Sequence, residues 1–299
     1  MIPVGTVYGL HLTGGTSIRL AAGDSKSADL LNRLALIMQL EPDGYSVCSS
    51  CLWLTVDPLF SAPEGQRMCQ LSQWPPGKAE VFFYQLMKIS SDLQRMLLSR
   101  GALLLHSALA VYPDPVAGER GVLLAAAGGT GKSTAVSRLQ SPWRALCDDA
   151  VLVAMESDFP EPRWRAHPWP TWSRLLDGGP GGSWPVETSV SLGAVYFLNR
   201  DNLEWIQPLG RGQAAVRLQE SARQIGNLLL RGRLPAEKRS ILAAQFEQAV
   251  KLAKSIPCAD LHLTLHGAFW QDLEQELTQR LRKAGSAVQS DWAGVPVLG

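Results

Sequence analysis

The sequence "GVLLAAAGGTGKST", residues 121–134, determines how the chain is interpreted. An apolar run that predicts a buried strand leads into a glycine-rich turn, and the residues after the turn have helical character. Strand, glycine-rich turn and helix in this order are typical of a phosphate-binding loop, whose pattern is G-x-x-x-x-G-K-[ST]. Ala126 stands where that pattern has its first glycine. Because the chain leaves the strand there, we expect a small residue with a negative φ to be tolerated.

The loop contains the residue types that bind a nucleoside triphosphate. Glycines let several backbone N–H groups point inward at phosphate oxygens, and a helix N-terminus favours an anion. We expect Lys132 to contact the β- and γ-phosphates and the Ser133 hydroxyl to bind Mg²⁺. A fortuitous turn of the same composition is the alternative. The predicted nucleotide-binding residues are Gly128, Gly129, Thr130, Gly131, Lys132, Ser133 and Thr134.

An acidic pair follows the loop in "CDDAVLV", residues 147–153. Two adjacent carboxylates at the end of a strand can provide a magnesium ligand and a base that takes a proton from an attacking hydroxyl. Aspartate is also common in turns, which is the alternative interpretation. Because a phosphate-binding loop lies close by in the sequence, we expect Asp148 and Asp149 to be catalytic, with Asp149 and Ser133 as metal ligands.

Composition limits the class of protein. The 299 residues are 46% apolar and 18% charged, as in globular proteins, and the formal net charge of +1 indicates neither a nucleic-acid partner nor an acidic membrane surface. We see no apolar segment long enough to cross a bilayer and no secretory signal, so we expect a cytoplasmic location. Five cysteines do not suggest a disulfide scaffold, and we interpret Cys48 and Cys51 as ordinary strand and turn residues.

The order of the predicted elements indicates two α/β parts. Residues 1–100 predict a smaller accessory domain, residues 101–284 an α/β catalytic core, and residues 285–299 a loose tail. In the first part we expect a hairpin turning at Gly14 and Gly15, a helix over 27–40, a strand over 51–57 and a helix over 79–99. In the core we expect strands over 101–112, 121–127, 144–155, 192–200 and 259–269, helices between 212 and 256 and over 270–284, and a loop-like stretch over 160–185.

Residues 103–139 and "ALCDDAVLV", residues 145–153, together resemble the core of the HPr kinase/phosphorylase group. In that group a histidine-containing strand precedes a turn, a strand, a glycine-rich loop ending in GKS, a helix and an acidic pair. His106 in "LLLHSALAVY" matches that histidine, although a lone histidine in an apolar strand is usually a satisfied core residue. Weaker similarity along most of the chain, including "LGAVYFLNR" and "PLGRGQAAVRL", is to the ScmC proteins of the SynChlorMet cassette.

The resemblance implies a phosphoenolpyruvate carboxykinase-like P-loop fold that uses ATP and Mg²⁺. It implies transfer of phosphate to a serine hydroxyl of a peptide or protein, and the ScmC similarity suggests a natural-product pathway that modifies peptides. Asp148 or Asp149 would be the base, and His106 would tune or share its proton. The first hundred residues do not resemble the regulatory domain of the HPr enzyme, which argues against HPr as the acceptor and against phosphorolysis.

Two further stretches have alternative interpretations. In "HPWPTWSR", residues 167–174, two interpretations are open. The side chains of His167, Trp169, Trp172 and Arg174 could line a substrate groove, with Arg174 as a phosphate contact, or the tryptophans could pack a proline-stiffened loop on the core. In "RGRLPAEKR", residues 231–239, the positive charge could meet an acidic peptide, or the stretch could be a solvated connection between helices.

Two other functions remain open at this level. The chain could be a nucleotide-binding scaffold or chaperone of a peptide-modification complex, with little catalysis. It could also be a small-molecule kinase with a compact acceptor pocket. A homo-oligomer is compatible with the sequence.

Overall fold

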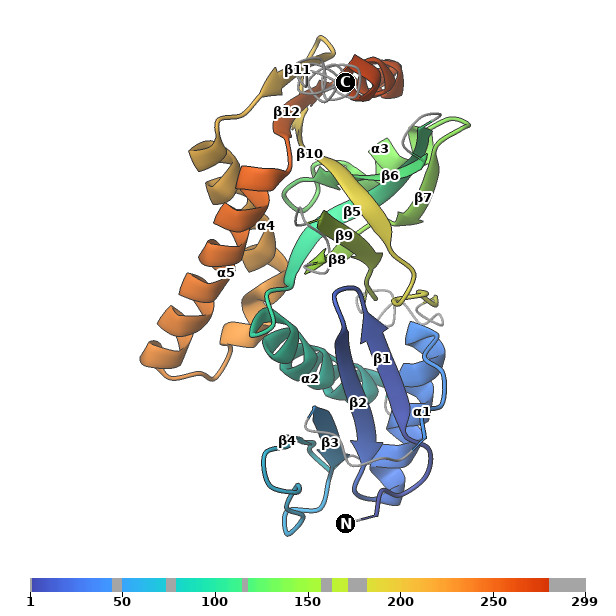
Figure 1. Ribbon diagram of the computed structural model, residues 1–299, viewed down its shortest axis with the longest axis vertical. Helices are drawn as coiled ribbons and strands as arrows, with labels where there is room; N and C mark the ends of the chain where they lie inside the picture. Colours follow the sequence, from blue (N-terminus) through green and yellow to red (C-terminus); the bar gives the residue numbers. More distant parts are fainter. Residues whose placement is uncertain are drawn as a thin grey trace, which may run out of the picture.

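The computed structural model describes residues 2–44, 50–73, 79–114, 118–156, 163–171 and 182–279. The fold is mixed α/β and contains two β-sheets, one formed by the N-terminal part of the chain and one by the rest (Figure 1). The domain boundary at residue 100 stays a prediction, because the two sheets show only which strands belong together and not where one domain ends.

The first sheet has four strands in the order β1-β2-β3-β4. The hairpin predicted at Gly14 and Gly15 is present, and both glycines have the positive φ (72° and 70°) that such a turn requires. The Asp24 carboxylate begins α1 by accepting a hydrogen bond from the Ser27 backbone N–H at 2.9 Å. The elements are β1 (Tyr8–Leu12), β2 (Thr16–Ala22), α1 (Ser25–Met38), β3 (Cys51–Thr55) and β4 (Arg67–Gln70).

The second sheet has eight strands in the order β11-β12-β10-β6-β5-β8-β9, with β7 also paired to β5. β10 is parallel to both β6 and β12, whereas β5 is antiparallel to β6. The carboxyl ends of β6, β10 and β12 therefore meet at one edge of the sheet, which we call the loop edge. The strands are β5 (Leu103–Asp114), β6 (Gly118–Ala125), β7 (Arg144–Cys147), β8 (Ala150–Glu156), β9 (Arg163–Pro168), β10 (Val190–Arg200), β11 (Trp205–Pro208) and β12 (Cys258–Leu263).

Helices pack on both faces of the second sheet. Alternation along β5 sends Leu109 and Val111 into the core shared with α4 and α5, while Ala108 and Ala110 face a smaller cluster that includes Ala135 of α3. The labelled helices that follow the first sheet are α2 (Ala79–Leu98), α3 (Lys132–Arg138), α4 (Arg211–Leu230) and α5 (Pro235–Ser255), and residues 269–279 are also helical.

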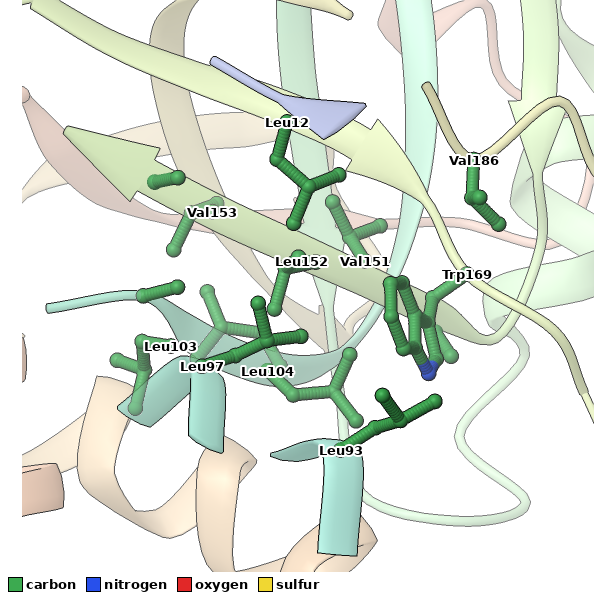
Figure 2. Close-up of a cluster of buried hydrophobic side chains, with 14 of the residues drawn as sticks. Leu12, Leu93, Leu97, Leu103, Leu104, Val151, Leu152, Val153, Trp169 and Val186 are labelled. Atoms are coloured by element: carbon green, nitrogen blue, oxygen red, sulfur yellow. The ribbon is translucent and has the colours of Figure 1, made fainter. Parts of the chain in front are cut away.

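One hydrophobic core joins the two sheets. Figure 2 shows Leu12 of β1 on one side of β8 and Leu93 and Leu97 of α2 near the opposite side, with Leu152 among them. All four side chains are nearly or completely buried. The N-terminal sheet and α2 therefore pack directly against the second sheet through apolar side chains.

The expected loop-like stretch over residues 160–185 is partly wrong, because β9 occupies residues 163–168 near its beginning. β9 pairs antiparallel with β8, and Trp164 and Ala166 are buried in the core. Of the tryptophans in this stretch, Trp164, Trp169 and Trp184 are buried. The short strands β4 and β11 were not predicted either.

The buried cysteines support an ordinary structural role. Cys51, Cys69, Cys147 and Cys258 are buried, whereas Cys48 lies outside the described residues. Burial raises the pKa of the Cys147 thiol to about 12, so this thiol is inert at neutral pH. Within the described ranges, no helix combines the length and apolar character that a membrane span needs.

Candidate functional site

The glycine-rich loop extends from the end of β6 at the loop edge, as predicted. Gly129 and Gly131 have φ values of 75° and 107°, which non-glycine residues rarely adopt. A Cβ placed on Gly128, Gly129 or Gly131 would meet no atom within 4 Å, so the glycines of this loop border open space. Gly129 and Gly131 are therefore required by the backbone conformation of the turn, and not because a side chain there would clash with neighbouring atoms. The loop is an open cradle of the kind that phosphate oxygens could enter.

Ala126 has no positive φ, since Gln39 is the one non-glycine residue with a positive φ among the described residues. Ala126 therefore adopts the backbone conformation, without a positive φ, under which we expected a small residue to be tolerated. Its carbonyl oxygen accepts a hydrogen bond from the Nζ atom of Lys132 at 3.2 Å. The residue that departs from the motif thus helps to hold the lysine of the motif.

Lys132 is the first residue of α3 and is 6% exposed. Its Nζ atom lies 2.6 Å from Nε2 of His106. An ammonium group can only donate hydrogen bonds, so Nε2 of His106 is the acceptor and the imidazole carries its proton on Nδ1. Lys132 is therefore held between a ring nitrogen of β5 and the carbonyl of Ala126.

The acidic pair lies beside His106 because of strand pairing. β7 and β8 both pair with β5, with Leu109 opposite Cys147 and His106 opposite Ala150, and the acidic pair is the break between these two strands. Asp149 Oδ1 lies 3.3 Å from Nδ1 of His106. A carboxylate, an imidazole and an ammonium group thus form a continuous row, Asp149–His106–Lys132, contributed by neighbouring strands and the loop.

Burial sets the charge states in this row. It lowers the pKa of His106, the nearby Lys132 charge lowers it further, and Asp149 opposes both effects. His106 is therefore mainly neutral at pH 7. Burial also lowers the pKa of Lys132, against the opposing attraction of Asp149 and Asp148. Burial in this row therefore favours the neutral form of His106.

Arg200, the last residue of β10, is a further site residue that the sequence did not single out. Its Nε atom donates to the carbonyl of Thr130 at 3.2 Å, and its Nη2 atom donates to the carbonyl of Gly129 at 2.7 Å. Two charged hydrogen bonds to consecutive carbonyls fix the orientation of the peptide groups in the turn. The available signal was its place at the end of a predicted strand, where ligand sites of α/β proteins are found.

Two hollows flank Arg200. One, of about 410 Å³, lies between the loop and α4 and is also lined by Arg217 and Glu220. The other, of about 380 Å³, lies between α3 and the ends of β10 and β12 and is also lined by Thr134 and Arg138. Both volumes fall in the range of small-ligand pockets. Neither hollow is lined by His106 or Asp149, which lie on the β5 side of the loop.

The expected metal ligands are accessible oxygen donors. Ser133 is exposed at the start of α3, and the side chain of Asp149 is 33% exposed. Magnesium commonly uses one or two carboxylates together with water and phosphate oxygens. This donor set fits such an ion completed by phosphate. The described part of the chain contains no group of three or more His, Cys, Asp or Glu residues that could hold a metal by itself.

His167, which we predicted as a candidate for the substrate groove, is not accessible to a substrate. His167 is fully buried, its Nδ1 atom lies 2.8 Å from the Val186 carbonyl, and its Nε2 atom lies 3.0 Å from the Thr13 hydroxyl. Burial lowers its pKa to about 4, so the ring is neutral and connects the β1–β2 hairpin to the second sheet. Trp169 is also buried, at 1% exposed, which agrees with the alternative that the tryptophans pack on the core. Trp172 and Arg174 lie outside the described residues.

Together the fold and the site define a mixed α/β protein with a glycine-rich loop at a sheet edge and a Lys–His–Asp row beside it. The family model described as SynChlorMet cassette protein ScmC matches residues 68–278, which is most of the chain. The chain therefore belongs to the ScmC family. The match begins in β4 and includes the loop, the Lys–His–Asp row and Arg200. A comparison with curated proteins gave no match.

Proposed function

We propose that this protein is an HPr kinase-like phosphotransferase that transfers the γ-phosphoryl group of ATP to a serine hydroxyl of a peptide or protein. The observation that carries the proposal is the row Asp149–His106–Lys132 beside an open glycine cradle. Phosphoryl transfer depends mainly on positioning and charge neutralisation, and these residues provide both.

The chain's own groups would bind the phosphates. Backbone N–H groups of Gly129 and Gly131 offer donors to phosphate oxygens, and the Lys132 ammonium neutralises charge on the transferred group. Lys132 must exchange its bonds to His106 and Ala126 for bonds to phosphate. Arg200 holds the loop carbonyls, so the turn keeps its shape during this exchange.

The exchange also defines the proton path. When Lys132 turns to the phosphates, Nε2 of His106 loses its donor, while Nδ1 still faces Asp149. The serine oxygen forms its bond to phosphorus as the bond to ADP breaks, and the serine proton passes to the carboxylate of Asp149. His106 orients that carboxylate and shares the proton. Asp148 is the second carboxylate of the pair and the alternative base.

Magnesium would be held by phosphate oxygens, by Ser133 and by whichever carboxylate of the pair is not the base: Asp148 if Asp149 takes the proton, or Asp149 if Asp148 does. The ion supplies charge neutralisation between the phosphates when bound. The exposed hydroxyl and the partly exposed carboxylate leave room for such a ligand set.

The family description gives a second candidate. A cassette protein works in the company of other proteins, and a nucleotide-binding scaffold of a peptide-modifying complex would also use the loop. A scaffold would not need the base. The acidic pair therefore distinguishes the two functions.

The test incubates the protein with ATP, Mg²⁺ and serine-containing candidate peptides and detects phosphopeptide by mass spectrometry. The proposal expects a phosphorylated product that falls at least about a hundredfold with Asp149→Asn while nucleotide affinity stays within about threefold. Asp148→Asn assigns the base between the two carboxylates. Nucleotide binding without phosphopeptide from any candidate, and unaltered partner function in both Asp variants, would support the scaffold instead.

A further inference from the structure

A basic hollow lies between α2 and the turn that joins α4 to α5, away from the glycine-rich loop. Its volume is about 390 Å³. Gly232 has a φ of 72°, which lets the chain reverse direction at the end of α4. We call it the α2 hollow, and its main lining residues are Tyr84, Met87 and Lys88 of α2 with Arg231, Gly232 and Arg233 of the turn.

The one carboxylate that lines the α2 hollow is already neutralised. Asp92 is 7% exposed and forms ion pairs with Arg95 at 3.3 Å and Arg233 at 3.6 Å. Its charge is therefore matched by two guanidinium groups before any ligand arrives. Lys88 and Arg231 are exposed and add positive charge at the rim, although Lys88 also donates a hydrogen bond to the Gln70 carbonyl.

The sequence around the turn concentrates this charge. Residues 231–239 contain four basic residues and one acidic residue, whereas the whole chain has a formal net charge of +1. The acidic residue, Glu237, is used locally, because its side chain caps α5 by accepting from the Leu234 backbone N–H at 3.3 Å. The rim is therefore a local positive field on a nearly neutral protein.

An aromatic side chain distinguishes this hollow from a plain basic surface. Tyr84 is 60% exposed and lines it together with Met87. Exposed tyrosine beside arginine is typical of surfaces that bind peptides, because both side chains give large contact area and hydrogen bonds. A compact hollow suits a few residues of peptide better than the extended basic stripe that a nucleic-acid backbone requires.

We propose that the α2 hollow binds an acidic segment of a peptide or protein partner, with Glu or Asp side chains pairing with Lys88 and Arg231 and an apolar side chain packing on Tyr84. Charge complementarity favours this occupant, and the binding does not depend on nucleotide.

The α4 helix connects the hollow to the candidate site. The Ser221 hydroxyl of α4 donates to the backbone carbonyl of His106 at 3.2 Å, and the same helix leads to Arg231 at the hollow. Ten residues of helix span about 15 Å, which an extended peptide covers with about five residues. An acceptor peptide bound in the α2 hollow would therefore present a nearby serine to the candidate site. This consequence rests on the proposed function, whereas binding of the peptide in the hollow does not.

The test measures fluorescence anisotropy of a fluorescein-labelled short peptide of Glu, Gly and Leu, with a Gln-for-Glu peptide as control. The double variant Lys88→Glu/Arg231→Glu should weaken binding of the Glu peptide at least about tenfold. The matched variant Lys238→Glu/Arg239→Glu makes the same charge change on exposed residues of α5 outside the hollow and should weaken it less than about threefold. Tyr84→Ala should weaken binding about threefold or more without changing charge.

Three results would overturn the proposal: equal losses in the two double variants, equal binding of the Gln peptide, or tighter and hollow-dependent binding of a single-stranded oligonucleotide or anionic lipid vesicles. Binding of a fluorescent ATP analogue, measured on the same proteins, separates this proposal from the proposed function. Peptide binding that persists in Lys132→Ala, where nucleotide binding is lost, supports the docking site on its own.

Discussion

The Nε2 atom of His106 lies 2.6 Å from the Nζ atom of Lys132, so a histidine of β5 holds the lysine of the glycine-rich loop. The lysine that phosphates would need is therefore engaged by the protein's own groups. Because the imidazole must be neutral to accept this bond, the protonation of His106 controls how firmly Lys132 is held.

Triphosphate affinity should therefore depend on pH through His106. Because burial lowers the pKa of His106 from its ordinary value of 6.5, the ring gains its proton only as pH falls below 6.5. Its contact with Lys132 is then lost, and a second cation stands near the phosphates. We expect the affinity of the parent protein for an ATP analogue to rise as the ring gains its proton. In His106→Gln the phosphates of the ligand still titrate, but the imidazole is absent. The affinity of this variant should therefore change less with pH.

The measurement is anisotropy of a fluorescent ATP analogue at several pH values for both proteins. Identical pH profiles would contradict the role given to His106.

The loop glycines should differ in their tolerance of alanine. Gly131 has a φ of 107°, so Gly131→Ala strains the backbone and should lower the free energy of unfolding by about 1–3 kcal/mol. Gly128 has no positive φ and the same open space around it, so Gly128→Ala should change stability by less than about 0.5 kcal/mol. Urea denaturation of the two variants makes the comparison, and equal losses would contradict the conformational explanation.

Arg200→Ala should loosen the loop without removing a phosphate ligand of the motif. The variant loses both hydrogen bonds to the carbonyls of Gly129 and Thr130. We expect several-fold faster amide hydrogen exchange in residues 126–131 and several-fold weaker binding of the ATP analogue. Arg211→Ala removes an exposed arginine at the start of α4 and serves as the control. Unchanged exchange in the loop would show that Arg200 does not support it.

His167 should make stability depend on pH. The pKa of the ring is about 4 in the folded protein and 6.5 in its ordinary state, so the unfolded chain binds more protons between these values. Stability is complete above about pH 6.5 and is lost as pH falls toward about 4, reaching a loss of about 2 kcal/mol near pH 5. His167→Gln should reduce this dependence, measured by urea denaturation at about pH 7.5 and pH 5. A parent and a variant with parallel pH dependence would contradict the assignment.

The sequence was most informative where chemistry is local. The loop could be predicted because strand, glycines and Lys132 are contiguous and each is required by backbone conformation or charge. For Asp149 the sequence predicted only that the residue lies near the glycine-rich loop, and not which side chain it contacts. Its contact with His106 depends on β7 and β8 both pairing with β5, which brings together two residues that are 43 positions apart in the sequence.

Arg200 and the α2 hollow could not be predicted for the same reason. Arg200 reaches the loop because β10 pairs with β6 across a long stretch of chain, and no local pattern reports that pairing. The charge in residues 231–239 was noticed, but its partners on α2 depend on helix packing. For the stretch around His167 the sequence left a substrate groove and packing on the core both open. The pairing of β9 with β8 decides for burial, and no local pattern in a Pro- and Trp-rich stretch indicates that pairing.

The most direct test of the central claim is isothermal titration of ATP with Mg²⁺ into the parent protein and into Lys132→Ala, with Lys238→Ala as a control for loss of a lysine elsewhere. The account predicts one binding site in the parent and in the control, and affinity at least about a hundredfold weaker in Lys132→Ala, because the buried ammonium neutralises phosphate charge. Equal affinity in all three proteins, or no binding to the parent, would contradict a phosphate-binding loop at residues 126–133.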